Sequence, residues 1–310
     1  MTGRIKRDFL TVTDFSKEEL RANLDLAIEI KAKSKEGNNL DILKGGVGAL
    51  IFHKPSLRTR SSFEVGFRQL GGSAVYITSK EIDLGKRETI HDVAKVMSRY
   101  YSAICIRTFS HKDVEELAFH ADVPVVNMLT DLFHPCQLMA DMQTILEHKG
   151  TIDNLKITYM GDGNNMTNSW MKMAQRVPME LTIGTSPETL PDMNLFKETN
   201  NLGLSTVVIE NDPEKAVKDA DVIYTDVWAS MGAKDKIQEQ IARLTPYQVN
   251  MKLVKQAKPD VTIMHCLPAE RGREITSDVM DLPNTVVFDE AENRLHAQKA
   301  VLVKLLENRD

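Results

Sequence analysis

The first residues of this 310-residue chain that could do chemistry are His53-Lys54-Pro55-Ser56-Leu57-Arg58-Thr59, which follow an apolar run at 47–52. Pro55 disfavours helix before it, and Ser56 is a favourable N-cap for a helix after it. A helix N-terminus offers free amides and partial positive charge, and Arg58 adds a planar fork of donors. These groups suit a phosphate, although an N-cap followed by solvated arginines remains the simpler alternative. The segment is not the Gly-rich Lys-Ser/Thr loop of nucleotide hydrolases, which argues against ATP.

Two more polar clusters follow apolar runs in the first half of the chain. Arg107 ends the run at 102–107, and His134 and Gln137 stand on either side of Pro135, which suits the first position of a helix. A histidine there can donate to a carbonyl oxygen, and a glutamine can bind an amide. A histidine that only caps the helix is the alternative.

The second half of the chain has three clusters of the same kind. The segment 161–166, Gly-Asp-Gly-Asn-Asn-Met, begins like a dinucleotide-binding loop, but Met166 occupies the third glycine position. Asp226 follows the run at 221–225, and Cys266 lies in a polar strand end that Pro268 terminates. Such a strand end is a poor place for an inert thiol.

The elements that must position these residues alternate between short apolar runs and helical patterns. Strands are predicted at 47–52, 73–78, 102–107, 123–127, 156–160, 180–184, 205–209, 221–225, 261–265 and 285–288. Helices are predicted near 59–70, 89–100, 111–121, 135–149 and 291–306, and after the capping box Ser16-Lys17-Glu18-Glu19.

This alternation predicts an α/β protein with two doubly wound parallel-sheet lobes and a cleft between them. In such sheets ligands bind beyond the carboxyl ends of the strands, where the polar clusters lie.

Composition narrows the function classes. The chain has 39 Lys and Arg against 44 Asp and Glu, a net charge of −5, so no basic field for nucleic acid or an anionic membrane is expected. No apolar run approaches the ~18 residues of a membrane span, and the N-terminal residues show no apolar signal region. The three cysteines lack disulfide or metal spacing, and Cys105 and Cys136 are expected to be inert core residues. We expect a cytoplasmic protein without metal or cofactor.

Taken together, the clusters resemble the aspartate/ornithine carbamoyltransferase family over nearly the whole chain, and its ornithine carbamoyltransferases most. The motifs that carry the resemblance are Ser56-Leu57-Arg58-Thr59-Arg60, His134-Pro135-Cys136-Gln137, Asp226 with Ser230-Met231-Gly232, His265-Cys266-Leu267-Pro268 and Phe288-Asp289-Glu290-Ala291-Glu292-Asn293-Arg294-Leu295-His296. The resemblance implies a carbamoyl phosphate-binding domain at 1–134, an ornithine-binding domain at 135–289 and a C-terminal helix at 290–310 that packs back on the first. It also implies a homotrimer or a multiple of trimers.

The resemblance also implies the role of each site residue. Carbamoyl phosphate would be held by Ser56, Leu57, Arg58, Thr59, Arg107, His134, Gln137, Cys266, Leu267 and Arg294. Ornithine would be held by Asn165, Asp226, Ser230 and Met231. The residues expected to take part in catalysis are Cys266, Arg107, His134 and Asp226.

The chemistry agrees with these roles. Cationic and neutral donors stabilise the oxygen that gains charge when an amine attacks the carbonyl carbon. An alkylammonium with a pKa near ~10.4 is neutral in about 1 of 2,500 molecules at pH 7, so the site must favour its deprotonation. Cys266 and Asp226 are candidates to orient or accept that proton. A single direct displacement needs no acyl-enzyme, so Cys266 is not expected to be a covalent nucleophile.

Three positions depart from the family pattern. Leu57 replaces the usual Thr and keeps only its backbone amide as a donor, and His53 stands where Glu is usual. Asp83 falls where a Gln often reaches into the neighbouring site; its carboxylate would repel phosphate unless it turned towards Lys86 or Arg87.

Other functions stay open from sequence alone. Related carbamoyltransferases act on aspartate, acylated ornithine or putrescine, but Asp226 with Ser-Met-Gly fits an α-amino acid with a free ammonium. The Gly-Asp-Gly segment suggests an NAD-dependent oxidoreductase as an alternative, but Met166 at the third glycine position argues against it. A non-catalytic relative is disfavoured because the polar groups of the site are retained together.

Overall fold

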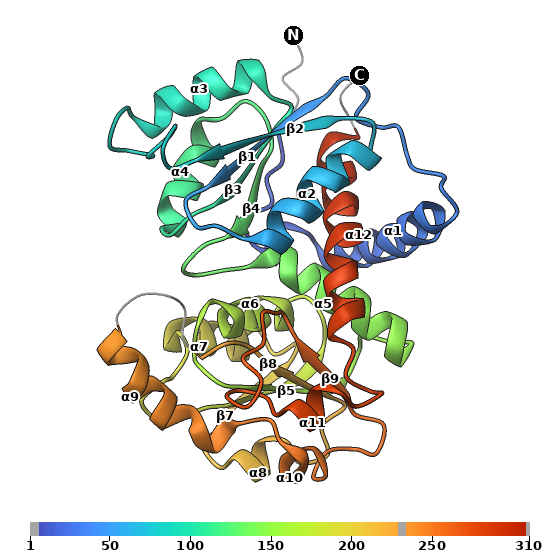
Figure 1. The fold of residues 1–310 in the computed structure, drawn as a ribbon, viewed down its shortest axis with the longest axis vertical. Coiled ribbons are helices and arrows are strands. Elements are labelled where there is room, and N and C mark those ends of the chain that lie inside the picture. The colour runs from blue at the N-terminus through green and yellow to red at the C-terminus, as the bar shows by residue number, and fades with distance from the viewer. Residues whose placement is uncertain (1–5, 229–233, 308–310) are drawn as a thin grey trace. The chain divides into compact units, whose positions relative to one another are not determined.

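The chain folds into two compact units, each built on an all-parallel sheet, in a computed structural model that describes residues 6–228 and 234–307 (Figure 1). The first unit comprises Met1–Gln143 together with Glu292–Asp310, and the second comprises Thr144–Ala291. The last helix of the chain therefore belongs mainly to the first unit. Helix α5 (Pro135–Lys149) contains the point at which the chain passes from the first unit to the second.

The sheet of the first unit has the strand order β2-β1-β3-β4. Its strands are β1 (Val47–Phe52), β2 (Ser73–Thr78), β3 (Ala103–Arg107) and β4 (Val125–Leu129). From β1 the chain adds β2 on one side and then returns to add β3 on the other. The loops after β1 and β3 therefore flank a topological switch point, the usual ligand site of such sheets.

Helices cover both faces of this sheet, as Figure 1 shows. The helices of the first unit are α1 (Lys17–Lys35), α2 (Leu57–Gln69), α3 (Ile90–Tyr100), α4 (His111–His120), the first part of α5, and α12 (Val287–Leu306) from Glu292 onward, with the short η1 (Val12–Asp14). Ala49 and Ile51 pack with α3 and α4. Gly48, which precedes Ala49, faces the other way, where a Cβ would lie 2.2 Å from the Phe67 ring of α2. Helix α12 packs on α2 in turn, because Gly66 leaves room for Leu295 and Lys299.

The sheet of the second unit has the order β7-β6-β5-β8-β9. Its strands are β5 (Leu155–Met160), β6 (Met179–Gly184), β7 (Thr206–Glu210), β8 (Val222–Thr225) and β9 (Thr262–His265). Its helices are α6 (Asn165–Ala174), α7 (Met193–Asn201), α8 (Pro213–Ala216), α9 (Lys234–Leu244), α10 (Met251–Val254) and α11 (Ser277–Met280), with the short η2 (Thr245–Tyr247). The direction of winding reverses between β5 and β8, so the loops after β5, β8 and β9 lie at neighbouring strand ends.

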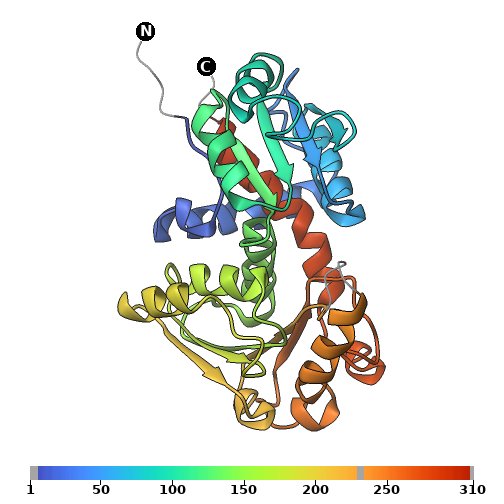
Figure 2. The ribbon, with the colours of Figure 1, turned by 90° about the vertical axis from the view of Figure 1, so that its left-hand side faces the viewer.

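Both faces of this second sheet are also covered (Figure 2). Ile223 and Ile263 pack into an apolar cluster with residues of α8, α10 and α11. The neighbouring Tyr224 points to the opposite face, where its ring meets Trp170 of α6 edge-on at 5.4 Å. Each unit therefore has its own apolar core, as a doubly wound sheet requires.

The predicted two-lobed, parallel-sheet fold class is confirmed, and nine of the ten predicted strands form. The strand predicted at 285–288 is wrong. Only Thr285 bridges to Ile263, and α12 begins at Val287. The apolar run Val286-Val287-Phe288 fits either type of element, but Asp289 and Glu290 favour a helix N-terminus. Within the described residues, no helix is long and apolar enough to cross a membrane.

Candidate active site

The N-terminus of α2 forms the first part of the site, in the first unit. Ser56 is the N-cap, and its hydroxyl accepts from the Thr59 amide at 3.3 Å, as its residue type predicts. Leu57 turns its side chain outward, 78% exposed, so only its backbone remains near the helix end. Arg58 in the same turn is half-buried. The helix end thus offers amide donors and partial positive charge at the switch point of the sheet.

The Thr59 hydroxyl is the contact point of two guanidinium groups that come from different elements. Arg107 Nη1, at the end of β3, donates to Thr59 Oγ1 at 3.5 Å, and Arg294 Nη2, on α12, donates to the same oxygen at 3.4 Å. The Ser56 hydroxyl donates to it at 3.1 Å. Thr59 and Arg294 are buried at 1% and 3% exposure. The structure therefore brings together four residues that lie as far apart as 56 and 294 in the sequence.

Gln137 joins this cluster through Arg294. Arg294 Nη1 donates to Gln137 Oε1 at 2.6 Å, and Gln137 Nε2 donates to Asp141 Oδ1 at 2.8 Å. The Gln298 amide is oriented so that its oxygen faces the Arg294 guanidinium. This oxygen accepts from both Nη2 and Nε of Arg294 at 2.8 Å. All of these side chains are buried. The Arg294 guanidinium is thus fixed from several sides, as a group that must meet a small ligand needs to be.

His134 is buried beside the same two arginines. Its burial and the neighbouring Arg294 and Arg107 guanidiniums lower the pKa of the His134 imidazole well below its usual range. The ring is therefore neutral at pH 7, and it can donate one hydrogen bond without carrying charge.

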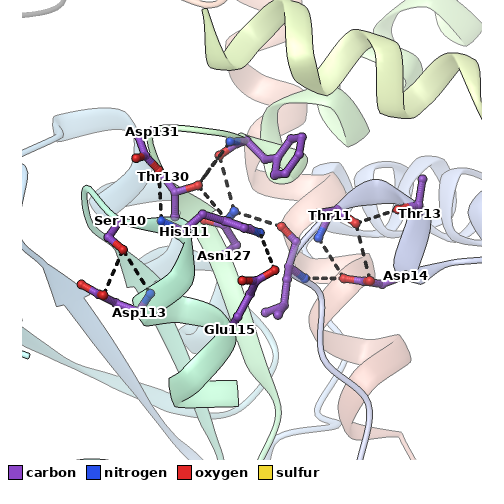
Figure 3. A network of polar contacts seen from close by, with 12 residues as sticks. Thr11, Thr13, Asp14, Ser110, His111, Asp113, Glu115, Asn127, Thr130 and Asp131 are labelled. Carbon is purple, nitrogen blue, oxygen red and sulfur yellow. Dashed lines mark hydrogen bonds and ion pairs between the residues drawn. The ribbon is translucent and has the colours of Figure 1, made fainter. Parts of the chain in front are cut away.

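A polar network in the first unit braces the loop before His134 (Figure 3). Asn127 of β4 donates through Nδ2 to the Leu10 carbonyl at 2.9 Å and to the Phe133 carbonyl at 3.4 Å. The Thr130 hydroxyl contacts His111 Nδ1 at 3.0 Å and accepts from the Phe133 amide at 3.2 Å. These contacts tie the loop to β4, to α4 and to the N-terminal segment, and so fix where His134 enters α5.

Two residues that depart from the family pattern, His53 and Asp83, make defined contacts in the first unit. His53 contacts the Thr108 hydroxyl at 2.8 Å and the Ile82 carbonyl at 3.0 Å, so it links the β1 end to the segment after β2. Asp83 pairs with Lys86 at 3.0 Å, one of the two partners considered for it. Lys54 lies over the Phe109 ring at 5.0 Å, and burial together with Arg107 lowers its pKa.

The second unit brings Asp226 and Cys266 into contact at the ends of β8 and β9. Cys266 Sγ donates to Asp226 Oδ1 at 2.9 Å, and the Val227 amide donates to the same oxygen at 2.7 Å. Asp226 is 9% exposed. The thiol thus has a carboxylate partner that the sequence spacing did not reveal.

The backbone after Cys266 is held by a buried histidine and glutamate. The Leu267 amide donates to His265 Nδ1 at 2.8 Å, so the ring proton lies on Nε2, which donates to Glu274 Oε1 at 3.0 Å. Leu267 has φ 55°, a conformation that non-glycine residues rarely adopt, so this hydrogen bond fixes an otherwise unfavourable turn. The main chain at Cys266 and Leu267 is therefore rigidly oriented.

The loop after β5 lies at the neighbouring strand end. Asn164 is the N-cap of α6 and accepts from the Met166 amide at 2.8 Å and from the Tyr159 hydroxyl at 3.3 Å, and Asn165 begins the helix. Asp162 accepts from Gln240 of α9 at 2.6 Å, and burial together with the Asp226 charge raises its pKa to about 6. Acidic groups therefore gather at the edge of the second sheet.

The glycine motif of this loop serves packing within the chain. A Cβ on Gly163 would lie 2.3 Å from the backbone of Leu190, and the Gly163 amide donates to the Thr189 carbonyl at 2.8 Å. The close approach that this glycine permits is thus to the protein's own backbone, which accounts for a glycine here without a dinucleotide.

Asp226, His265 and Cys266 are near enough to raise the question of a metal, since their ligand atoms lie within 4.8 Å of one another. Both His265 ring nitrogens are engaged, with Leu267 and Glu274. A metal would have to displace one of these contacts, so the arrangement fits hydrogen bonding better than metal ligation.

Two predicted residues, Ser230 and Met231, lie outside the described residues. Sequence reasoning also assigned no role to three buried or half-buried groups beside the predicted ones: Lys54, Asp141 and Gln298. The last two follow Gln137 and Arg294 by four positions, which places each pair on one helix face. That spacing is the signal that could have found them.

Comparisons with known proteins agree with this architecture. The family model described as aspartate/ornithine carbamoyltransferase, carbamoyl-P binding domain, matches residues 7–147, and the one described as the Asp/Orn binding domain matches residues 153–305. The chain is 49% identical to an ornithine carbamoyltransferase of Anoxybacillus flavithermus, with 99% of each chain covered. It is 51% identical to that of Carboxydothermus hydrogenoformans, with 97% of each covered.

Solved structures give the same result at the level of the fold. The ornithine carbamoyltransferase from Pyrococcus furiosus superimposes with a TM-score of 0.94 at 47% identity over 100% of both chains. The anabolic enzyme from Campylobacter jejuni gives 0.91 at 32% identity over 98% of this chain and 100% of that one. With both family models matched and identity near one half over full length, the chain belongs to the aspartate/ornithine carbamoyltransferase family.

Proposed function

We propose that this protein transfers the carbamoyl group of carbamoyl phosphate to the δ-amine of L-ornithine, giving L-citrulline and phosphate. The observation that carries the proposal is the convergence of Arg107 and Arg294 on Thr59 at the N-terminus of α2. Relatives that share about half of their sequence with this chain are named ornithine carbamoyltransferases, which supports ornithine as the acceptor.

Carbamoyl phosphate is assigned to the first unit. Its phosphate would be held by the α2 amides, including that of Leu57, and by the side chains of Ser56, Arg58, Thr59 and Arg107. His134, Gln137 and Arg294 would hold the carbamoyl group, and on the resemblance we keep the main chain at Cys266 and Leu267, which belong to the second unit, as further contacts. A neutral His134 and a cationic Arg294 would donate to the carbonyl oxygen, which gains negative charge as the amine attacks.

Ornithine is assigned to the second unit. Asp226 would pair with the α-ammonium, and Asn165 at the N-terminus of α6 would receive the α-carboxylate, which the helix dipole also favours. We keep Ser230 and Met231 as further ornithine contacts on the resemblance. The proposed domains remain 1–134 with 290–310 for carbamoyl phosphate and 135–289 for ornithine.

The reaction is a direct displacement. The δ-nitrogen forms a bond to the carbonyl carbon while the bond from that carbon to the phosphate oxygen breaks. The proton that the amine loses passes to the departing phosphate or to the Cys266–Asp226 pair. Because Cys266 Sγ donates to the carboxylate, the thiol would orient Asp226 rather than attack the carbonyl carbon.

The test is an assay of the ureido product, which is citrulline when the amine is ornithine, on purified protein with carbamoyl phosphate and each amine in turn. We expect turnover with L-ornithine, and at least ~100-fold lower kcat/KM with the other three amines. Putrescine lacks the α-carboxylate, N-acetylornithine has a blocked α-amine, and aspartate lacks the δ-amine and brings a second carboxylate. Activity with one of those amines and none with ornithine would reject the proposal.

Replacement of Cys266 tests the mechanism. A hydrogen bond to a charged group contributes about 1.5–3 kcal/mol, so Cys266→Ala should lower kcat about 10–100-fold without abolishing turnover. Cys266→Ser keeps a donor and should lose less, and Cys105→Ala, in the core of the first unit, serves as the control. A carbamoyl thioester trapped on the wild-type protein would contradict direct displacement.

The resemblance also supports a homotrimer, or a multiple of trimers, and the composition of the chain supports a cytoplasmic location. Sedimentation velocity on the purified protein should give a mass of three chains or a multiple of three. A monomer at micromolar concentration would contradict this proposal.

A further inference from the structure

Asp141 is a buried carboxylate that lies one helical turn after Gln137 on α5. It is 0% exposed, and its Oδ1 accepts from Gln137 Nε2 at 2.8 Å. On the other side of the same amide, Gln137 Oε1 accepts from Arg294 Nη1 at 2.6 Å. The Gln137 side chain is 1% exposed, so both ends of its amide are held within the protein.

The two neighbours of the amide leave it only one satisfactory orientation. A guanidinium can only donate, and an ionised carboxylate can only accept. If the Gln137 amide turned over, its NH₂ group would face the Arg294 donors and its oxygen would face the Asp141 carboxylate. Both contacts would then be repulsive in a buried site, where electrostatic interactions are strong.

This orientation matters for the substrate. The carbamoyl group ends in an NH₂, which offers donors and needs acceptors. Gln137 can supply such an acceptor only while its oxygen, and not its nitrogen, faces the carbamoyl site.

We propose that Asp141 is a positioning residue that locks the Gln137 amide, so that its oxygen stays available to Arg294 and to the carbamoyl NH₂. The proposal rests on the proposed function. It assigns Asp141 no contact with substrate, because its effect passes through Gln137.

The substitution Asp141→Asn tests the lock with minimal change of shape. An asparagine carries both a donor and an acceptor, so it satisfies Gln137 in either orientation and removes the part of the preference that Asp141 imposes, which leaves only the Arg294 contact to favour the native orientation. We expect the Kd for carbamoyl phosphate to rise about tenfold, as for one lost charge-assisted hydrogen bond, and kcat/KM to fall by a similar factor. Inorganic phosphate has no NH₂, so its Kd should stay within about twofold by isothermal titration calorimetry.

A reciprocal exchange of the two groups gives a second, independent test. Gln137→Glu alone sets two carboxylates one turn apart and should reduce carbamoyl phosphate binding by more than tenfold. In the double variant Gln137→Glu with Asp141→Asn, the asparagine NH₂ donates to the glutamate, whose other oxygen faces Arg294. This double variant should bind carbamoyl phosphate at least about fivefold more tightly than Gln137→Glu alone.

Two results would overturn the lock. One is an equal loss of carbamoyl phosphate and phosphate binding in Asp141→Asn, which would indicate a general structural role. The other is a double variant no better than Gln137→Glu. Neither depends on ornithine as acceptor: a wild-type protein that binds carbamoyl phosphate but makes no citrulline would refute the proposed function and leave this binding comparison intact.

Discussion

At the scale of single residues, the chemistry of each unit depends on groups that fix one another. The Thr59 hydroxyl accepts from Ser56, Arg107 and Arg294, so one neutral group positions two guanidinium groups next to each other. In the second unit Cys266 and the Val227 amide hold one oxygen of Asp226. Preorganised donors of this kind need no rearrangement when charge develops in a transition state.

Asp162 offers a prediction at this scale. Its pKa is raised to about 6 from 3.8, so between these values the folded state binds more protons than the unfolded state, and stability falls as pH rises. Asp162→Asn removes this loss while it keeps an acceptor for Gln240. The variant should gain stability over the wild type from pH 4 to pH 7, by at most about 3 kcal/mol, measured by urea unfolding.

The control for this prediction is Asp219→Asn, an exposed position in the same unit whose φ of 56° suits asparagine. The difference in free energy of unfolding between Asp219→Asn and the wild type should not change over the same pH range. If the free energy of unfolding of Asp162→Asn differed from that of the wild type by the same amount at pH 4 and at pH 7, the pKa of Asp162 would not be raised in the folded protein.

The residue types of the site were predictable from the sequence, but most partnerships between them were not. Ser56 as an N-cap follows from local rules, because the residues that it contacts are three positions away. The Asp226–Cys266 contact spans 40 positions and depends on β8 and β9 being neighbours in the sheet. A linear pattern does not contain that adjacency.

At the scale of elements, α12 is a helix that carries several polar and charged side chains into the core. Lys299 is 1% exposed, and its Nζ donates to Ser34 of α1 and to Gln69 of α2 at 2.7 Å each. Burial lowers the pKa of this ammonium to about 8. One cation thus joins three helices through neutral acceptors, at the cost of its own desolvation.

Replacing Lys299 should change how stability depends on pH. The unfolded state binds more protons than the folded state between pH 8 and 10.5, so wild-type stability should rise through that window. The contribution is about 3 kcal/mol over the full window. Lys299→Met should lack this rise, so the stability difference between variant and wild type should shift in favour of the wild type from pH 7 to pH 10 in urea unfolding.

Lys112→Met, at an exposed position on α4, is the matched control and should leave the pH profile unchanged. Parallel profiles for Lys299→Met and the wild type would mean that the pKa of Lys299 is not lowered in the folded protein.

Element boundaries show where local rules suffice. The strands at 47–52 and 73–78 and the helix at 135–149 form with the predicted bounds, because turn residues and periodicity agree there. At 285–288 the local sequence signals conflict. The apolar run favours a strand, yet only one bridge to β9 forms, and the acidic residues that follow start α12.

At the scale of the whole chain, the division into two units implies that each substrate stabilises its own part. Carbamoyl phosphate should slow amide hydrogen exchange in α2, at the end of β3 and in α12, and norvaline, an ornithine analogue without the reactive amine, should slow it after β5, β8 and β9. Hydrogen exchange with mass spectrometry measures both. Protection by inorganic phosphate confined to the second unit would contradict the assignment of domains.

The contribution of α12 to the first unit also bears on biosynthesis. Arg294, Gln298 and Lys299 are synthesised after the second unit, although they contact Thr59, Ser62 and Ser34, which are synthesised before it. A nascent chain that has emerged as far as the second sheet still lacks one of its two arginine anchors and a core helix. Competence to bind the phosphorylated substrate therefore arrives only once α12 has emerged from the ribosome, and a polypeptide aborted before α12 cannot sequester a labile metabolite.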